Sequence, residues 1–395
     1  MASIERRERD GKLIWRAHYR APDGKQRNKT FARKIDAERF LTTVENSKLT
    51  GAYIDPMLSR LTVGEWSKRW LDGQAHLKPS THERYAGIVR AHIEPRWRNV
   101  RLAEVSHADV QGWVSDLSRR RSPATVCKVH RVFSMVLSLA VKDGRLARNP
   151  AVGVHVPRSA QAEHVYLSHD QVGLLAEEVS HPYETGSRAC EADREAAKSY
   201  GLVVLFLAYT GVRWGEMAAL RVGRINFLRR RASIVESVTL VRGVATWGAP
   251  KGHDRREVPI PRFLIEKLAQ HVSGKQPADL VFTGVKGGPL RSQMFQGAAL
   301  TAAATRVGAP GLTPHKLRHT AASLAIASGA NVKVVQTMLG HKSATMTLDL
   351  YGHLFADQLD EVADALDAAR SLAAQAAVAR ALPETKIGLL PTSLK

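Results

Sequence analysis

Apolar and polar side chains alternate in the first fifty residues, as they do in half-buried β-strands. Residues 13–20 alternate apolar or aromatic with polar side chains, a turn signal follows at 22–25, and residues 26–31 supply a partner strand. An apolar stripe that starts at Ile35 predicts one helix. Residues 1–56 therefore predict a β-rich module with a three-stranded sheet, one helix and a small core.

From residue 62 the apolar positions recur with the period of a helix. Three start signals precede apolar stripes: Ser80 with Glu83 as a capping box, Ser106, and Ser122 before Pro123. The third stripe ends at Gly144. We expect a helical domain over residues 62–155, with linkers at 51–56 and after 149.

The remaining chain contains segments with the apolar repeat of helices and segments with the alternation of strands. A cap at Ser168 opens a helix, residues 196–209 form one strongly apolar helix that ends at Gly211, and residues 233–241 and 257–260 read as strands. Residues 163–356 therefore predict a mixed α+β domain. Residues 357–395 predict an Ala-rich helix up to Leu382 and a tail. The whole chain is expected to be multidomain and mainly α.

The excess of basic over acidic residues indicates that the protein binds a negatively charged partner. The 395 residues include 58 basic and 37 acidic side chains, a net charge of +21. Residues 1–160 alone carry +15 of it, which favours nucleic-acid binding modules over a uniformly basic surface kept for solubility. Two cysteines imply no disulfide framework and suit a reducing compartment. We expect no membrane span, because no uncharged apolar run reaches about 18 residues, and no signal peptide.

Two basic groups are candidate DNA contacts, with a merely solvated charged face as the alternative. A small sheet can enter a DNA major groove, and three adjacent arginines at a helix end can bind phosphates. The first group, on the expected sheet, is Arg16, His18, Arg20, Arg27 and Lys29; the second, between two helices, is Arg119, Arg120 and Arg121.

A candidate reactive cluster follows Pro314. A proline there predicts a helix that opens at His315, and His315 and Arg318 share one face because they are three residues apart. Leu317 and Ala321 would form the buried face. Backbone N–H groups at a helix start favour an anion. Imidazole and guanidinium groups in this setting suit phosphoryl transfer, where negative oxygens are held and protons are moved.

Five ordered motifs carry a resemblance. They are Thr210-Gly211-Val212-Arg213 with Glu216, Lys251 in a loop between strands, His315-x-x-Arg318-His319-Thr320, Leu339-Gly340-His341, and Tyr351. Together they resemble the tyrosine recombinase, or phage integrase, family, and their context is similar to integrases of actinobacterial phages. The upstream segments resemble the arm-binding (1–56) and core-binding (62–155) domains of that family, and residues 163–356 its catalytic domain.

The resemblance implies a role for each motif. Tyr351 is implied as the nucleophile that forms a 3′-phosphotyrosyl link to DNA. Arg213 and Arg318 are implied to hold the phosphate, and Lys251 to protonate the leaving 5′-oxygen. His315 and His341 would assist proton transfer, while Glu216 and His319 would be supporting residues. No metal or cofactor is expected, since the histidines lack zinc-ligand spacing with cysteines.

The implied function is site-specific recombination that integrates or excises a mobile element. Expected partners are double-stranded core-type and arm-type attachment sites, a homotetramer on DNA, an excisionase or directionality factor and a host DNA-bending protein, in the bacterial cytoplasm near the nucleoid. A type IB topoisomerase-like relaxing enzyme and a non-catalytic DNA-binding regulator on the same fold are the alternatives.

Overall fold

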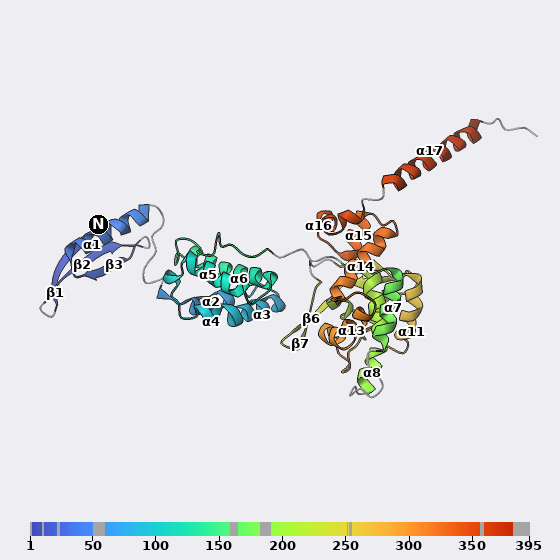
Figure 1. Cartoon of the computed structure of the whole chain (residues 1–395), viewed down its shortest axis with the longest axis horizontal. Helices are drawn as coiled ribbons and strands as arrows, with labels where there is room; N and C mark the ends of the chain where they lie inside the picture. The colour runs from blue at the N-terminus through green and yellow to red at the C-terminus, as the bar shows by residue number, and fades with distance from the viewer. Residues whose placement is uncertain are drawn as a thin grey trace, which may run out of the picture. The chain divides into compact units, whose positions relative to one another are not determined.

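The computed structural model describes residues 2–9, 12–21, 24–49, 60–158, 165–181, 191–250, 252, 255–355 and 359–381. The chain divides into two compact units, Met1–Ala162 and Glu163–Lys395 (Figure 1). The expected fold class is confirmed, because the described residues are mainly helical and carry small sheets. The centre of the predicted turn at 22–23, the linker at 51–56 and Lys251 lie outside the described residues.

The amino-terminal module is a three-stranded antiparallel sheet with one helix. The sheet order is β1-β2-β3. Ala17 and Tyr19 of the middle strand pack against Ala37, Leu41 and Val44 of the helix, which form its small core. The elements are β1 (Ser3–Arg9), β2 (Lys12–Arg20), β3 (Gln26–Phe31) and α1 (Lys34–Leu49).

Strand register divides the first group of candidate DNA contacts between the two sides of the sheet. Lys29 lies opposite Ala17 and Arg27 lies opposite Tyr19. Directly paired residues point to the same side of a sheet, so Lys29 and Arg27 lie on the side that α1 covers. Lys29 Nζ is 4.8 Å from the centre of the Phe40 ring on that helix. The open side keeps Arg16, His18 and Arg20 of the predicted group, all on β2.

The helical part of the first unit has an aromatic core. Trp97 and Phe133 stack with ring centres 5.2 Å apart, and Trp113 meets both rings edge-on. The elements are α2 (Val63–Asp72), α3 (Pro79–Ile88), the π-helix η2 (Val89–Ile93), α4 (Glu94–Trp97), the 3₁₀-helix η3 (Leu102–Glu104), α5 (His107–Ser118) and α6 (Pro123–Lys142).

The helix starts are confirmed at two positions and wrong at one. Ser106 caps α5, and α6 begins at Pro123. Ser80 is no cap, because α3 already begins at Pro79, whose missing N–H suits the first position of a helix. The capping box of this region lies instead at Thr62, whose side chain and Glu65 bond to each other's backbone N–H.

Helix α6 is long and apolar enough to cross a membrane by length and composition, which the sequence prediction did not anticipate. Its apolar face is buried in the core of the first unit, where Val129, Phe133 and Leu137 are at most 1% exposed. This burial accounts for its composition, so α6 is a core helix.

The second unit has helices around two small sheets. Helix α9 is largely buried and packs against both α7 and α14, which Figure 1 labels. The expected helix over 196–209 is interrupted at residues 198–199, so it is two helices. The helices are α7 (His169–Ser180), α8 (Glu191–Ala197), α9 (Tyr200–Thr210), α10 (Trp214–Met217), η4 (Val222–Arg224), α11 (Arg262–His271), α12 (Ser292–Phe295), η5 (Gln296–Leu300) and α13 (Thr301–Arg306).

The expected strand over 233–241 is also two strands, and they belong to different sheets. One sheet has the order β4-β5-β8 and the other is the hairpin β6-β7. The β6–β7 hairpin lies in the sequence between β5 and β8, which pair with each other in the first sheet. The strands are β4 (Ile225–Asn226), β5 (Arg231–Ile234), β6 (Ser237–Val241), β7 (Val244–Gly248) and β8 (Arg256–Pro259).

The carboxyl-terminal helices carry the candidate motifs. Leu339 and Tyr351 belong to a small core shared by α14, α15 and α16. On α17 the apolar stripe is exposed, with Leu359 80% and Leu366 66% accessible. The elements are α14 (Pro314–Ala327), α15 (Val332–Leu339), α16 (Ala344–Tyr351), η6 (Gly352–Leu354) and α17 (Leu359–Ala381).

Candidate active site

The site is assembled at the carboxyl end of helix α15. The last carbonyl groups of a helix have no partner within it and need donors from elsewhere. Gly340 ends α15 in a left-handed conformation, with φ of 66°. Three consecutive carbonyl oxygens, those of Met338, Leu339 and Gly340, each accept a hydrogen bond from another element.

A different arginine binds each of these three oxygens. Arg256 Nε donates to the first at 3.1 Å, Arg318 Nη2 to the second at 2.5 Å, and Arg213 Nη2 to the third at 3.2 Å. The negative end of a helix dipole favours cations. Strand β8, helix α14 and the start of α10 are therefore joined at one helix end, and three guanidinium groups converge there.

Glu216 balances part of this charge. Its buried carboxylate is bound by Arg256 at 2.6 Å and by Arg213 at 2.9 Å. It also accepts from the backbone N–H of Arg213, which closes a capping box at the start of α10. Burial raises the pKa of Glu216, but Arg256 and Arg213 outweigh it and lower the pKa below the usual value. The carboxylate thus orients two arginines.

Arg318 lies deeper than the sequence pattern suggested. The side chain was expected on an open face with His315, yet Arg318 is only 3% exposed whereas His315 is exposed. Its Nη1 also donates to the carbonyl of Gly211, at 2.5 Å, where α9 ends. Burial, then repulsion by Arg213, lowers the Arg318 pKa to about 9, so the guanidinium stays charged at pH 7.

Gly211 explains how these elements approach so closely. It ends α9 with φ of 64°, and a Cβ added there would lie 2.7 Å from Cδ2 of Leu339. A side chain at this position would be strained by the positive φ and would force the Leu339 side chain to shift. The glycine of the Thr-Gly-Val-Arg motif is a packing requirement of the site.

His341 follows directly after the arginine-bound turn. Its Nδ1 lies 3.0 Å from Oγ1 of Thr347. Burial lowers its pKa to about 4, and Arg318 and Arg213 act in the same direction. His341 is therefore neutral at pH 7. Its ring lies parallel to that of Tyr351, with the centres 6.4 Å apart.

Tyr351 ends helix α16 and is 1% exposed. Its hydroxyl oxygen lies 2.8 Å from Nδ1 of His319, one helical turn after His315. The rings of His319 and His315 are in edge-on contact, with centres 5.3 Å apart. Burial raises the pKa of Tyr351 to about 12, although Arg318 opposes the shift.

The structure therefore joins the predicted residues that it describes into one continuous set of contacts. The set runs from the arginines and Glu216 through His341 and Tyr351 to His319 and His315. Lys251 lies outside the described residues, in the segment between β7 and β8. Within the described ranges, no group of three His, Cys, Asp or Glu side chains is placed to hold a metal ion.

Sequence reasoning missed Arg256. It belongs to none of the five motifs, yet its side chain is 7% exposed and binds both Glu216 and α15. The sequence held a signal for this role, namely the apolar residues Val258 and Ile260. Val258 is a buried position of β8, and Ile260 is buried just after the strand. Alternation along a strand puts Arg256 on the same inward side.

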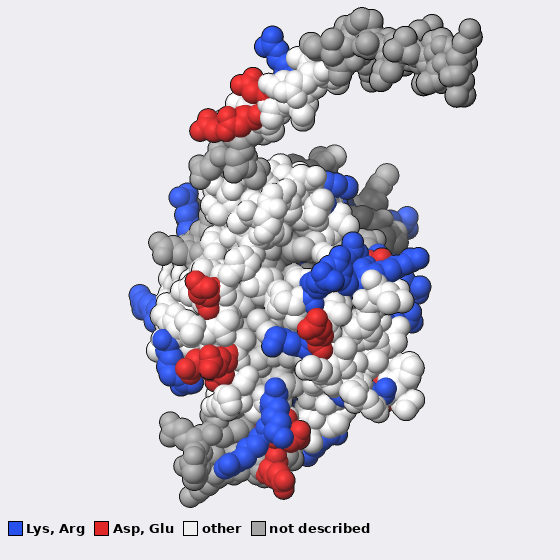
Figure 2. Space-filling model, turned by 90° about the vertical axis from the view of Figure 1, so that its right-hand side faces the viewer, with Lys and Arg blue, Asp and Glu red and all other residues white. Residues whose placement is uncertain are grey.

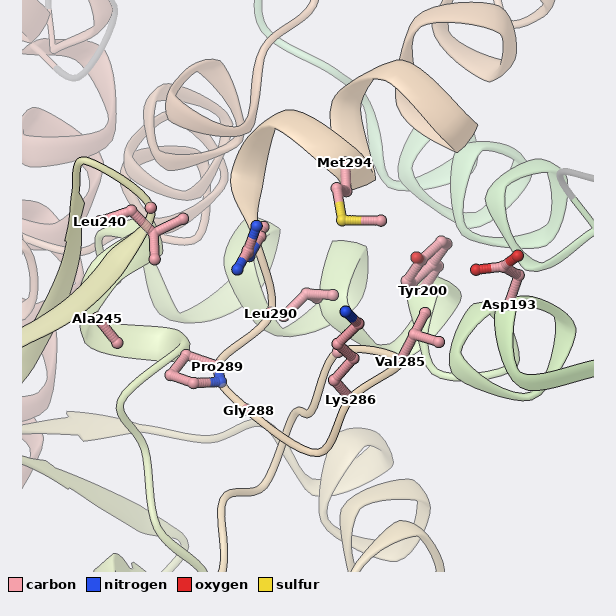
Figure 3. A pocket seen from close by; sticks show the side chains of 13 residues that line it. Asp193, Tyr200, Leu240, Ala245, Val285, Lys286, Gly288, Pro289, Leu290 and Met294 are labelled. Atoms are coloured by element: carbon pink, nitrogen blue, oxygen red, sulfur yellow. The ribbon is translucent and has the colours of Figure 1, made fainter. Parts of the chain in front are cut away.

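Two hollows lie beside this set, along the β6–β7 hairpin. A cavity of about 340 Å³ is lined by Tyr200, Leu290 and Met294, with Lys286 beside it (Figure 3). A second hollow, of about 740 Å³, shares Leu290 and Met294 and reaches Arg213. The hairpin and Arg213 of the arginine cluster thus line the same hollow.

Comparison with known proteins places these features in a family. Residues 167–358 match the phage integrase family and residues 62–118 match the phage integrase N-terminal SAM-like domain. The chain is 26% identical to an integrase of Mycobacterium phage D29, covering 80% of this chain and 79% of the relative. It is 25% identical to a tyrosine recombinase XerC-like protein of Caldanaerobacter subterraneus, covering 91% and 93%.

Solved structures share the fold. The Tn1549 transposon integrase in complex with transposon right end DNA is 19% identical, with a TM-score of 0.64 over 78% of this chain and 100% of that one. A lambda integrase dimer bound to a COC′ core site is 17% identical, with a TM-score of 0.55 over 90% and 95%.

Arg256→Ala should destabilise the second unit by about 3–5 kcal/mol, because it removes one partner of a buried ion pair. Arg255→Ala is the matched control, since Arg255 is the exposed neighbour and surface changes usually stay within about 0.5 kcal/mol. Urea unfolding of both variants measures the difference. Equal stabilities would contradict the structural role of Arg256.

Stability should also fall on acidification from about pH 6.5 to about pH 4 because of His341. Its folded pKa is about 4, against an ordinary 6.5, so in this window the unfolded chain binds a proton that the folded chain does not. His341→Asn should flatten this part of the profile relative to wild type. His155→Asn, at an exposed histidine, should leave it unchanged, and thermal melts across the window test both.

Proposed function

The chain belongs to the phage integrase family of tyrosine recombinases, and we propose that it cuts and rejoins DNA with Tyr351 as the nucleophile. The reaction is site-specific recombination that integrates or excises a mobile element. The observation that carries the assignment of residues is that a buried tyrosine, which contacts His319, shares a core with Leu339, at the helix end where three guanidinium groups converge.

The chemistry follows from these side chains. The phenol oxygen of Tyr351 attacks a phosphodiester, which gives a 3′-phosphotyrosyl link and a free 5′-hydroxyl. The link keeps the phosphodiester energy, so rejoining needs no further energy source. Arg213 and Arg318 bind the non-bridging oxygens, since a planar, permanently charged fork suits them. Lys251 protonates the leaving oxygen, and His315 and His341 hydrogen-bond the phosphate.

Within this assignment Glu216 and Arg256 act as positioning residues. Glu216 binds both Arg213 and Arg256, so it sets the direction of the guanidinium that the phosphate would meet. Arg213 is the most accessible of the three arginines, with a quarter of its side chain exposed. It borders the hollow along the β6–β7 hairpin, which we assign to the DNA backbone on either side of the cut.

DNA binding is divided among the modules. Residues 62–155 and 163–356 would hold a core-type site, and residues 1–56 an arm-type site. The basic charge of the first 160 residues supports this division. Arg119, Arg120 and Arg121 are all exposed at the end of α5 and would bind phosphates. On the second unit, Figure 2 shows Lys and Arg side chains gathered most densely in one area of the face in view.

Assembly and location follow from the same proposal. A homotetramer would join two DNA sites through a Holliday junction, assisted by a directionality factor and a host DNA-bending protein. Helix α17 exposes apolar and acidic side chains and is the candidate for exchange between protomers (Figure 2). The reaction requires host DNA, so we place it in the bacterial cytoplasm at the nucleoid.

The two alternatives explain less. A type IB topoisomerase-like enzyme would use the same cleavage chemistry but has no need of a separate amino-terminal DNA-binding module. A non-catalytic regulator would have no need of a tyrosine, three histidines and three arginines held in one contact set.

Tyr351→Phe should abolish covalent capture of DNA while duplex binding stays unchanged, because only the attacking oxygen is removed. Nicked suicide duplexes with randomised cores, selected by capture on the wild type, supply the substrate. A denaturing gel measures the adduct and a mobility shift measures binding. Tyr209→Phe is the control for loss of a tyrosine hydroxyl elsewhere. A persisting adduct in Tyr351→Phe would refute the assignment.

Removing residues 1–56 should spare cleavage of core duplexes and remove binding to arm-type DNA, because the module has a core of its own. Binding of arm DNA by the full chain should weaken steeply with salt, log K falling by roughly 0.9 per phosphate neutralised. Fluorescence anisotropy measures arm binding by the shortened and the full chain and, over a salt series, its salt dependence. Covalent capture of suicide duplexes measures cleavage. Unchanged arm binding by the shortened chain would contradict the proposed role of the module.

A further inference from the structure

The hydroxyl of Tyr351 has a partner whose chemistry the assignments above leave unused. Nδ1 of His319 lies 2.8 Å from it, within the range of a direct proton transfer. His319 is half-buried on α14, one turn after His315. By contrast, Nδ1 of His341 lies 3.0 Å from the Thr347 hydroxyl.

A buried phenol needs such a partner. With a pKa of about 12, roughly one Tyr351 in 10⁵ would be ionised at pH 7. Arg318 favours the phenolate but does not accept a proton. Attack on phosphorus therefore requires a base that takes the proton as the new bond forms.

We propose that His319 is the general base that accepts the proton of Tyr351 during DNA cleavage. This assignment rests on the proposed function and adds a catalytic residue to it. The proposal requires Nδ1 to accept the hydrogen bond in the resting state, which puts the ring proton of neutral His319 on Nε2. The contact also keeps the hydroxyl oriented before the phosphate arrives.

The step balances without a further reactant. The Tyr351 O–H bond breaks and its proton moves to Nδ1 of His319, while the phenol oxygen bonds to phosphorus. The bond from phosphorus to the 5′-oxygen breaks, and that oxygen takes a proton from Lys251. Rejoining runs in reverse: the 5′-hydroxyl returns its proton to Lys251, and imidazolium His319 returns its proton to the departing phenolate.

Several ionisable groups face this pair and shape its pH response. His341 is neutral above about pH 5, because its pKa is about 4. Arg318 is cationic, and Tyr166 raises the pKa of Tyr351 slightly. His315 contacts the ring of His319, so its titration must be separated by a variant. The groups around the pair are His315, Arg318, His341, Tyr166 and His353.

Single-turnover cleavage of the captured suicide duplex tests the proposal. His319→Asn places an amide oxygen near the position of Nδ1, so it keeps an acceptor but cannot take a proton. It should slow cleavage about 100-fold or more, the usual contribution of a general base, with duplex binding unchanged. His319→Gln, which places its amide near Nε2, should be slow as well.

The pH profile separates a base from a positioning contact. The wild-type rate should rise with pH and level off as an imidazole becomes neutral. His319→Asn should lose this inflection and keep rising with pH, whereas His315→Asn should retain it. A wild-type profile without an inflection between pH 5 and 8 would overturn the proposal, even if the His319 variants failed to fold.

The leaving group gives a matched control. A duplex with sulfur in place of the bridging 5′-oxygen releases a thiolate, which needs no proton from an acid. This substrate should restore the rate of Lys251→Ala but not that of His319→Asn. His319 would not be the base if the sulfur-containing duplex rescued Lys251→Ala and His319→Asn equally. The same conclusion would follow if His319→Asn cleaved the ordinary duplex as fast as the wild type or faster. If the wild type captured no duplex at all, the proposed function itself would fail.

Discussion

The catalytic unit depends on how one helix end is satisfied. The last turn of α15 offers three carbonyl oxygens, and a different arginine binds each. Those arginines come from a strand, a helix start and a helix interior that are far apart in the chain. The same contacts that complete α15 therefore concentrate positive charge. Glu216 is buried between two of the arginines and neutralises part of that charge.

This arrangement explains why fold and chemistry are hard to separate here. An arginine that binds a helix carbonyl has its orientation set before any phosphate arrives, and preorganised charge is what stabilises a developing anion. Gly211 and Gly340 contribute by conformation and by size, since they let α9, α15 and β8 approach closely. Positioning by backbone contacts also leaves the remaining guanidinium donors for the substrate.

Tyr351 presents the opposite problem. Its ring completes a small core with Leu339 and Ala321, and burial makes its hydroxyl harder to ionise. The proposed nucleophile would therefore stay inactive until a neighbouring group accepts its proton. Under the proposed mechanism, the imidazole of His319 and the charge of Arg318 would activate it.

The sequence by itself determined the mainly helical fold class and most helix starts, because these depend on periodicity and caps, and its motif order predicted the residue types of the site. It failed where contacts between distant segments decide the outcome. Strand register, which sent Arg27 and Lys29 to the covered side of the sheet, depends on pairing that no single strand specifies. The burial of Arg318, the role of Arg256 and the contact between His319 and Tyr351 were decided only by the tertiary structure, because each depends on segments packing around the end of α15 and α16.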